Sequence, residues 1–352
     1  MIEIAGDTLE GGGQIVRTSV ALAALAGEKV RIVKIRHNRP NPGLQAQHVT
    51  AITALAKICD AQTDGLRQGS RELIFRPQGH NTGKFRFDVG TAGSIPLILQ
   101  ALMPCLAFAP NSVELELTGG TDVKWSPSID YVQLAVLPTL QLMGYQAKLT
   151  VNRRGHYPKG GGKVTFNATP SGSLRAITLT KPDQLKSVQG VSHCVKLPSH
   201  VAQRQADAAR SKLAKDGYEA KLTVESYPPG RDQHIGPGSG VTLVTQFKNG
   251  SILGADSLGE RGKPAERVGE ECAEKLLEEL KSQASFDRHM GDILVPFIAV
   301  AEGRSEISIS QLTTHTLTNI HVAEKILHTT FQVNGKLGEF GTLTVEGVGL
   351  KT

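Results

Sequence analysis

The order of strand and helix signals repeats three times along this chain, and that repeat constrains the fold more than any other feature. Alternating apolar and polar residues mark the strands, and apolar residues spaced three and four apart mark the helices. The first copy spans residues 2–77, the second starts at Phe85, and the third is split between residues 176–180 and 287–347. The predicted helices are residues 14–25, 43–58, 94–108, 129–143, 287–301 and 318–327.

Each copy predicts a four-stranded sheet with two helices on one face. The predicted strands are a short one from Ile2, then residues 29–35, 72–75, 85–90, 113–120, 145–151, 161–166, 176–180, 305–310, 330–334 and 341–347. The fold class is therefore α/β, of the α+β type, with three repeated units packed together.

The third copy is interrupted by about a hundred residues, far beyond an ordinary loop. This segment has its own strands, a helix over residues 199–217 and a charged helix over Pro264–Leu280. In the charged helix, acidic and basic residues at i,i+4 spacing indicate a solvated face. We predict a small inserted α/β domain at 181–283 and a large domain at 1–180 and 284–352.

Charge and composition narrow the class of partner. Lys and Arg exceed Asp and Glu by 39 to 33, which permits RNA or a nucleotide as a partner without requiring one. Aromatic residues make up 5%, which argues against a recognition surface of stacked rings. The most apolar segment, Ile95–Phe108, is too short to span a bilayer and predicts a buried helix.

Four dispersed cysteines, without a CxxC pair, favour a reducing compartment over a disulfide framework or a zinc site. The first residues show no basic segment followed by an apolar one, so we expect no secretory signal. Together these features predict a cytoplasmic location and no membrane partner. The oligomeric state stays open.

The strongest local motif is EGGGQIVR, Glu10–Arg17, between a predicted strand and a predicted helix. Three glycines let main-chain N–H groups approach an anion, and the helix start adds its positive end. Arg17 lies one turn into the helix, and Glu10 could hold a divalent cation. The alternative is a tight strand-to-helix turn with no ligand.

A second motif, IRHNRPNPGLQAQH, carries Arg36, Arg39 and Gln47. Two prolines stiffen this loop, and arginines on a stiff loop suit bidentate phosphate contacts. The alternative is a solvated basic loop. Three arginines at one edge of the same predicted unit, Arg17 included, favour an anion site.

A third motif, HTLTN, begins at His315. We place His315 in the loop before a helix that Thr318 or Asn319 caps, exposed enough to act as a nucleophile. For a single histidine, an ordinary loop role is the alternative. Two further glycine clusters lie at 155–164 and 234–240, and either could cradle a phosphate. We expect the first to connect paired strands and the second to form a turn. P-loop, HExxH and GxSxG motifs are absent from the sequence.

In their order along the chain, EGGGQIVR, IRHNRPNPGL, TAGSIPLILQ, GHYPKGGGKV, GPGSG, HMGD and HTLTN resemble the RNA 3′-terminal phosphate cyclase family. The resemblance covers essentially the whole chain. It implies three repeats of two helices on a four-stranded sheet, with a small inserted α/β domain. It also implies an enzyme that uses ATP to convert an RNA 3′-phosphate end into a 2′,3′-cyclic phosphodiester. The route is a covalent histidine–AMP, then an RNA-adenylate, with release of pyrophosphate and AMP.

The resemblance also assigns residues, matched position by position. His315 is the nucleophile, and Glu10 helps to place Mg²⁺ or Mn²⁺. ATP is contacted by Gln100, His289, Met290, Gly291, Asp292 and Ile293. The phosphates of ATP or the RNA end are bound by Gln14, Arg17, Arg36, Arg39 and Gln47. Leu9 and Ile293 depart from the family's usual residues, at the loop before Glu10 and at the end of the HMGDI segment.

Three other functions are alternatives to this one. Cyclase-like proteins that have lost catalysis and serve in ribosome assembly lack the histidine of the HxxTN segment, whereas His315 is present here. An enolpyruvyl transferase would need about twice as many repeats. A plain RNA-binding module is disfavoured by the low aromatic content and the mild charge.

Overall fold

The computed structural model describes residues 1–228 and 230–351, and it contains three sheets of identical connectivity. In the first repeat the strand order is β1-β2-β4-β3, with β1 and β2 parallel and the other neighbours antiparallel. A parallel pair needs a crossover, and α1 supplies it. The elements are β1 (Ile2–Ala5), α1 (Gly13–Ala26), β2 (Val30–Val33), α2 (Ala46–Ile58), β3 (Gln62–Asp64) and β4 (Leu73–Arg76).

The second and third repeats have the same topology, in the orders β5-β6-β8-β7 and β9-β14-β16-β15. The second contains β5 (Gly83–Asp88), α3 (Ile95–Leu106), β6 (Val113–Gly119), α4 (Ile129–Tyr131), the π-helical segment Val132–Val136, α5 (Leu137–Leu142), β7 (Gln146–Arg153) and β8 (Gly162–Thr169). The third contains β9 (Thr178–Leu179), α8 (Arg288–Val300), β14 (Glu302–Ile309), α9 (Thr314–Leu327), β15 (Phe331–Gly335) and β16 (Gly341–Val348). The predicted fold class of three repeated units is confirmed.

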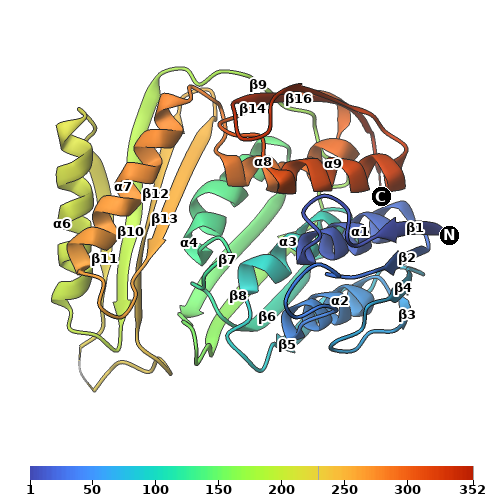
Figure 1. Cartoon of the computed structure of the whole chain (residues 1–352), viewed down its shortest axis with the longest axis horizontal. Helices are drawn as coiled ribbons and strands as arrows, with labels where there is room; N and C mark the ends of the chain where they lie inside the picture. The colour runs from blue at the N-terminus through green and yellow to red at the C-terminus, as the bar shows by residue number, and fades with distance from the viewer. Residues whose placement is uncertain (229, 352) are drawn as a thin grey trace.

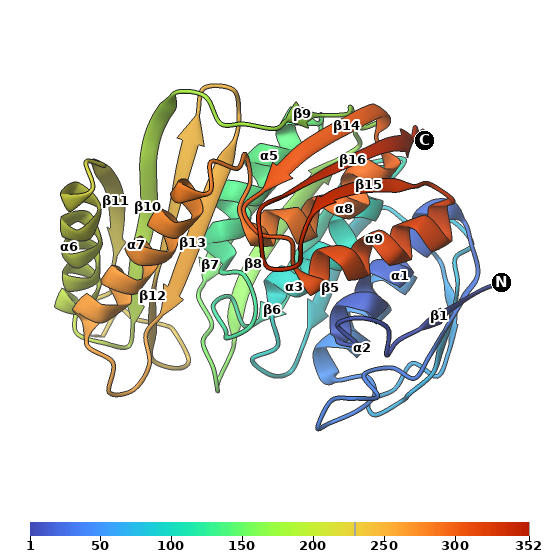
Figure 2. The same cartoon turned by 45° about the horizontal axis from the view of Figure 1, so that its top comes forward.

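The helices of the three repeats share one hydrophobic core. Helix α1 packs against both α3 and α9, so it touches all three units. The predicted buried helix α3 is buried along nearly its whole length. Figures 1 and 2 show the three helical layers facing one another, with the sheets on the outside. This packing brings the N-terminal ends of α1 and α9 together.

The inserted segment forms a fourth sheet with a different strand order, β11-β10-β12-β13. Its elements are β10 (Leu185–Val195), α6 (His200–Lys215), β11 (Ala220–Glu225), β12 (Gly238–Phe247), β13 (Ile252–Leu258) and α7 (Ala265–Lys281). Helices α6 and α7 pack side by side on it and enclose a separate apolar core (Figure 1). Val244 and Ile252 instead join the large core. The domain limits at 181 and 283 stay a prediction.

Two sequence-based assignments in the third repeat are wrong. Helix α9 begins at Thr314 rather than at residue 318, so His315 lies in its first turn and not in the preceding loop. The cap is Thr313, whose hydroxyl accepts a hydrogen bond from the Thr316 N–H at 3.0 Å. Thr318 and Asn319 are buried inside the helix and do not cap it.

The sequence pattern also missed β3, a three-residue edge strand too short to show alternation. The glycine cluster at 155–164 connects β7 to β8, as predicted. Among the described residues, no helix combines the length and the apolar character needed to cross a membrane.

Candidate active site

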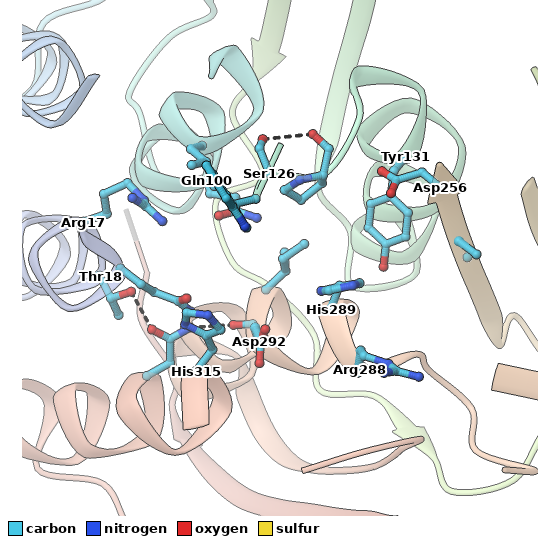
Figure 3. Close-up of a pocket in the computed structure, with 18 of the residues that line it drawn as sticks. Arg17, Thr18, Gln100, Ser126, Tyr131, Asp256, Arg288, His289, Asp292 and His315 are labelled. Atoms are coloured by element: carbon cyan, nitrogen blue, oxygen red, sulfur yellow. Dashed lines mark hydrogen bonds between the residues drawn. The ribbon is translucent and has the colours of Figure 1, made fainter. Parts of the chain in front are cut away.

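A cavity of about 580 Å³ lies where the three repeats meet the inserted sheet, within the size range of small-molecule sites. Its walls come from α1, α3, α7, α8, α9, β13 and the segment before α4 (Figure 3). Seven of the residues predicted from the sequence line it: Gln14, Arg17, Gln100, His289, Asp292, Ile293 and His315. Residues separated by three hundred positions thus share one site.

The glycines of EGGGQIVR lie close to two polar side chains. A Cβ atom on Gly12 would lie 2.1 Å from Glu10 Oε2, and one on Gly13 would lie 2.0 Å from Nε2 of His48. Gly11 has a φ of +60°, which glycine adopts without strain. The motif therefore places a carboxylate and an imidazole directly against the start of α1.

Arg17 is the strongest sign that the cavity binds an anion. The residue is 8% exposed and lines the cavity, yet it makes no hydrogen bond or ion pair within the described part of the chain. Burial lowers its pKa to about 10, so the guanidinium is still charged at neutral pH. A buried charge without a partner is costly, and a bound phosphate would supply the missing counter-charge.

His315 presents its imidazole to the same cavity from the first turn of α9. The side chain is 46% exposed, and its Nδ1 lies 4.0 Å from Glu10 Oε2. Nδ1 and this Oε2 are both buried without a hydrogen-bond partner among the described residues. Burial lowers the pKa of His315, and Arg17, His289 and Arg39 lower it further, while Asp292 opposes them. The imidazole is therefore neutral, the form that attacks an electrophile.

Asp292 holds the start of α9 in place. Its Oδ1 accepts hydrogen bonds from Thr313 Oγ1 at 2.5 Å and from Thr316 Oγ1 at 2.6 Å. Its main-chain carbonyl accepts one from Asn319 Nδ2 at 2.7 Å, and Asn319 Oδ1 accepts one from Thr18 at 2.7 Å. Burial raises the pKa of Asp292, and the two threonine hydrogen bonds oppose that rise. The network joins α8, α9 and α1 around His315 and so fixes its position.

The other predicted residues lie outside the cavity lining. Arg36 donates to the main-chain carbonyls of Asn41 and Gly43, at 2.7 and 3.3 Å, so its guanidinium holds its own loop. Arg39 forms an ion pair with Glu10, beside His315. Gln47 accepts a hydrogen bond from the Ser94 N–H at 3.3 Å.

Met290 and Gly291 are buried within α8. A Cβ atom on Gly291 would lie 2.8 Å from a methyl group of Ile309 in β14, so this side of the helix faces the sheet and not the cavity. Of the HMGDI segment, only His289, Asp292 and Ile293 reach the cavity.

Sequence reasoning missed the wall formed by the inserted domain and the segment before α4. Trp125, Ser126 and Pro127 line the cavity, and Trp125 is 95% exposed. Further lining residues are Tyr131, Asp256 and Arg288 (Figure 3), together with Lys275 of α7. The one available signal was the presence of the chain's single tryptophan in a polar, proline-containing segment.

Glu10 is the residue beside His315 whose chemistry fits a divalent cation. Its unpartnered Oε2 is a hard oxygen donor, and Mg²⁺ in nucleotide sites takes one or two carboxylates together with phosphate oxygens. Within the described chain, the one cluster of three His, Cys, Asp or Glu side chains with metal-ligand spacing lies elsewhere, at Asp122, His156 and His193.

Comparison with known proteins identifies the family of this chain. The family model described as RNA 3′-terminal phosphate cyclase matches residues 8–333. Proteins named RNA 3′-terminal phosphate cyclase from Ignicoccus hospitalis and Methanopyrus kandleri are 49% and 47% identical to this chain over 350 residues, covering 99% of each chain. The protein of that name from Caldivirga maquilingensis is 50% identical over 329 residues, 93% of each chain. This chain therefore belongs to the RNA 3′-terminal phosphate cyclase family.

Proposed function

We propose that this protein is an ATP-dependent enzyme that converts an RNA 3′-phosphate end into a 2′,3′-cyclic phosphodiester, through a covalent adenylate on His315. The observation that carries the proposal is the pairing of Arg17 and His315 in one cavity. A buried guanidinium without a partner is suited to hold a phosphate, and a neutral imidazole beside it is suited to attack one.

In the first step, the imidazole of His315 attacks the α-phosphorus of ATP. An N–P bond forms, the bond to the bridging oxygen breaks, and pyrophosphate leaves. Because Nδ1 is buried and faces Glu10, we assign the attack to Nε2. A proton on Nδ1 points at the carboxylate, which leaves the Nε2 lone pair free. Arg17 binds the phosphates, and Gln14 lies three residues before it on the same helix, near enough to assist.

Glu10 is the residue that would hold Mg²⁺ or Mn²⁺ through its free Oε2. A bound divalent cation would neutralise charge on the phosphates of ATP. Arg39 anchors the other carboxylate oxygen of Glu10, so the orientation of the free oxygen is fixed before any ligand arrives. Gln100, His289, Asp292 and Ile293 form the cavity wall on the α3 and α8 sides, where we place the adenosine.

The later steps follow from leaving-group chemistry. A 3′-phosphate is a poor electrophile because it is dianionic and would have to expel oxide. An oxygen of the RNA 3′-phosphate therefore attacks the phosphorus of histidine–AMP, and His315 leaves. The neighbouring 2′-OH then attacks the activated 3′-phosphorus, AMP leaves, and the ring closes.

A non-catalytic cyclase-like protein is the alternative, and the arrangement around His315 argues against it. Asp292, Thr313 and Thr316 hold the first turn of α9 in place, and the histidine faces a cavity with an unpaired arginine. A binding surface would need none of these features. All four cysteines are free and buried, and we expect the enzyme to act in the cytoplasm.

The test uses two RNA oligonucleotides of one sequence, ending in 3′-phosphate or 3′-OH, with ATP and Mg²⁺ or Mn²⁺. The 3′-phosphate of the first should become resistant to phosphatase, and the second should be unchanged. Arg17→Met should slow this protection, because it removes the guanidinium that binds the phosphates. The matched variant Arg86→Met, which removes an exposed arginine, should not. Equal consumption of the 3′-OH end, or no protection of the 3′-phosphate, would contradict the proposed function.

A further inference from the structure

The two glycine clusters that play no part in the ATP cavity meet at a second buried site. His156, from the cluster at 155–164, lies between β7 and β8, and Gly238, from the cluster at 234–240, begins β12. A Cβ atom on Gly238 would lie 2.0 Å from Cγ of His156, so glycine is required for the ring to enter. The rings of His156 and His193 then lie 5.2 Å apart, one from the second repeat and one from the inserted sheet.

This site contains buried polar atoms without a hydrogen-bond partner in the part of the chain that the structure describes. Two carboxylate oxygens lie near the His193 ring but beyond hydrogen-bond distance, Asp122 Oδ2 at 3.9 Å from Nε2 and Asp130 Oδ2 at 3.8 Å from Nδ1. Asp122, His156 and His193 are 2%, 6% and 1% exposed. Asp122 Oδ1, His156 Nε2 and both ring nitrogens of His193 have no hydrogen-bond partner among the described residues. Each such buried atom destabilises the folded state, so native structures rarely collect several at one place without a bound species.

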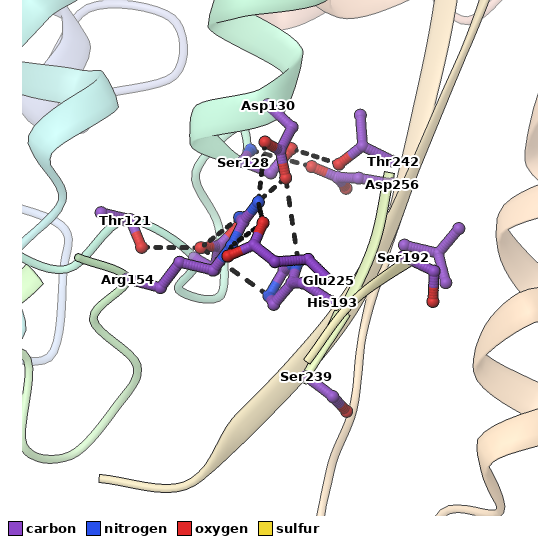
Figure 4. A network of polar contacts seen from close by, with 12 residues as sticks. Thr121, Ser128, Asp130, Arg154, Ser192, His193, Glu225, Ser239, Thr242 and Asp256 are labelled. Atoms are coloured by element: carbon purple, nitrogen blue, oxygen red, sulfur yellow. Dashed lines mark hydrogen bonds and ion pairs between the residues drawn. The ribbon is translucent and has the colours of Figure 1, made fainter. Parts of the chain in front are cut away.

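Carboxylates outnumber guanidinium groups around this site, which favours the binding of a cation. Figure 4 shows the guanidinium of Arg154 between carboxylates from both domains. Arg154 contacts Asp130 at 2.8 Å, Glu225 at 2.7 Å and Asp122 at 3.5 Å. One guanidinium thus faces three carboxylates, an excess of two negative charges when all are ionised.

The donor set is suited to a transition metal. One donor atom from each of Asp122, His156 and His193 lies within 4.8 Å of the others. Ligand atoms around a tetrahedral Zn²⁺ lie about 3.4 Å apart, since Zn–N and Zn–O bonds are about 2.0–2.2 Å long. Small side-chain rotations therefore close the site. Burial lowers the pKa of His156 to about 4, so its ring is neutral, the form that binds a metal.

We propose that Asp122, His156 and His193 bind a divalent transition metal of the Zn²⁺ type, which joins the inserted domain to the second repeat. Asp122 contributes Oδ1 and His156 contributes Nε2, the atoms left free by their other contacts. The Thr121 hydroxyl donates to the other oxygen of Asp122 at 2.6 Å and orients the carboxylate. The site is buried on all sides and separate from Glu10 and His315, so its role is structural.

The experiment measures metal in tag-free protein, so that no added histidines bind it. The protein is stripped with chelator, incubated with one to five equivalents of Co²⁺ or Zn²⁺, desalted and analysed by mass spectrometry for metal content. Parent protein, His193→Gln, His156→Gln, His315→Ala and the exposed control His200→Gln are compared. With three protein ligands, a water molecule would fill the fourth position, and the visible absorption of Co²⁺ reports this four-coordinate geometry and its nitrogen ligands.

We expect one equivalent of metal, with the four-coordinate Co²⁺ spectrum, in the parent, in His315→Ala and in His200→Gln. We expect loss of that equivalent in His193→Gln and His156→Gln. The unfolding temperature of the parent should rise by several degrees with Zn²⁺. If a histidine variant fails to fold, the parent's stoichiometry, spectrum and unfolding shift still decide the question. Loss of metal only in His315→Ala, or the absence of bound metal in the parent, would overturn the proposed metal site. Neither result would change the outcome of the cyclase assay, so the two proposals are tested separately.

Discussion

Oε2 of Glu10 lies 4.0 Å from Nδ1 of His315, although 305 positions separate the two residues. The packing of α1 against α9 creates this relationship. The Glu10 N–H also donates to Thr318 Oγ1 at 3.3 Å, which ties the glycine turn to α9. A carboxylate at this position favours the ring tautomer with the proton on Nδ1 and keeps Nε2 available as the nucleophile.

Glu10→Gln should slow adenylation of His315 by about 10- to 100-fold, the usual cost of losing a group that supports a metal or a catalytic residue. The amide keeps the shape and loses the charge, so the divalent-ion concentration needed for half-maximal rate should rise as well. Labelling rates across a Mg²⁺ or Mn²⁺ titration measure both effects. Glu3→Gln, at an exposed position in β1, is the matched control. Equal metal dependence in the Glu10→Gln and Glu3→Gln proteins would contradict the role of Glu10.

Arg17→Met should weaken ATP binding by about 10- to 100-fold, because a charge-assisted hydrogen bond contributes about 1.5–3 kcal/mol. The same change should leave the unliganded protein equally stable or more stable, since it removes a buried charge that has no partner in the described structure. ATP titration calorimetry and urea unfolding without ligand measure the two effects. A variant that binds ATP normally but unfolds more readily would show that Arg17 is a structural residue.

The repeats were predictable because each copy carries its own local pattern, and the interruption stood out by its length. The start of α9 could not be predicted, because the run TTHTLTN contains several residues that are able to cap a helix. Thr313 is selected by tertiary contacts, since its hydroxyl also donates to Asp292 from α8. A local pattern cannot contain that information.

The sequence predicted which types of residue form the candidate site better than it predicted where each of those residues lies in the structure. Arg17 and Arg36 are both predicted from the sequence to bind phosphate. In the described structure Arg17 lines the cavity without a hydrogen bond or ion pair, whereas Arg36 donates to main-chain carbonyls of its own loop. Which arginine is free depends on the backbone, here a positive φ of 53° at Arg36. Trp125 was missed because a single aromatic residue in a loop has no periodicity.

ATP should change the fluorescence of this protein. Trp125 is the chain's single tryptophan, is 95% exposed and lines the ATP cavity, so a bound nucleotide alters its surroundings. We expect a saturable change in emission intensity or wavelength as ATP is added, after correction with free N-acetyltryptophanamide. Arg17→Met should shift the midpoint to higher ATP concentration. Unchanged emission at saturating ATP would place the nucleotide elsewhere.

His48 should make the fold acid-sensitive. Burial, with smaller effects of Arg17 and Arg36, lowers its pKa to about 3. The unfolded chain takes up a proton below its ordinary pKa of about 6.5, and the native state does not, so stability falls as pH drops through the window from 6.5 towards 3. At about pH 5 the loss from this group is about 2 kcal/mol.

Urea unfolding followed by circular dichroism at neutral pH and at about pH 5 measures this effect. The acid-induced loss in His48→Gln should be smaller than in the parent by about 2 kcal/mol. His37→Gln, which changes an exposed histidine, should behave as the parent does. Equal acid-induced losses in the parent and in His48→Gln would show that His48 does not carry the dependence.

The covalent adduct tests the central claim most directly. The protein is incubated with α-labelled ATP and a divalent metal, denatured, and examined for label that acid releases and alkali does not, as expected for a phosphorus–nitrogen bond. We predict labelling of the parent and of His321→Ala, a change further along the same helix, and no labelling of His315→Ala. Labelling of His315→Ala at the parent's level would contradict the assignment of the nucleophile.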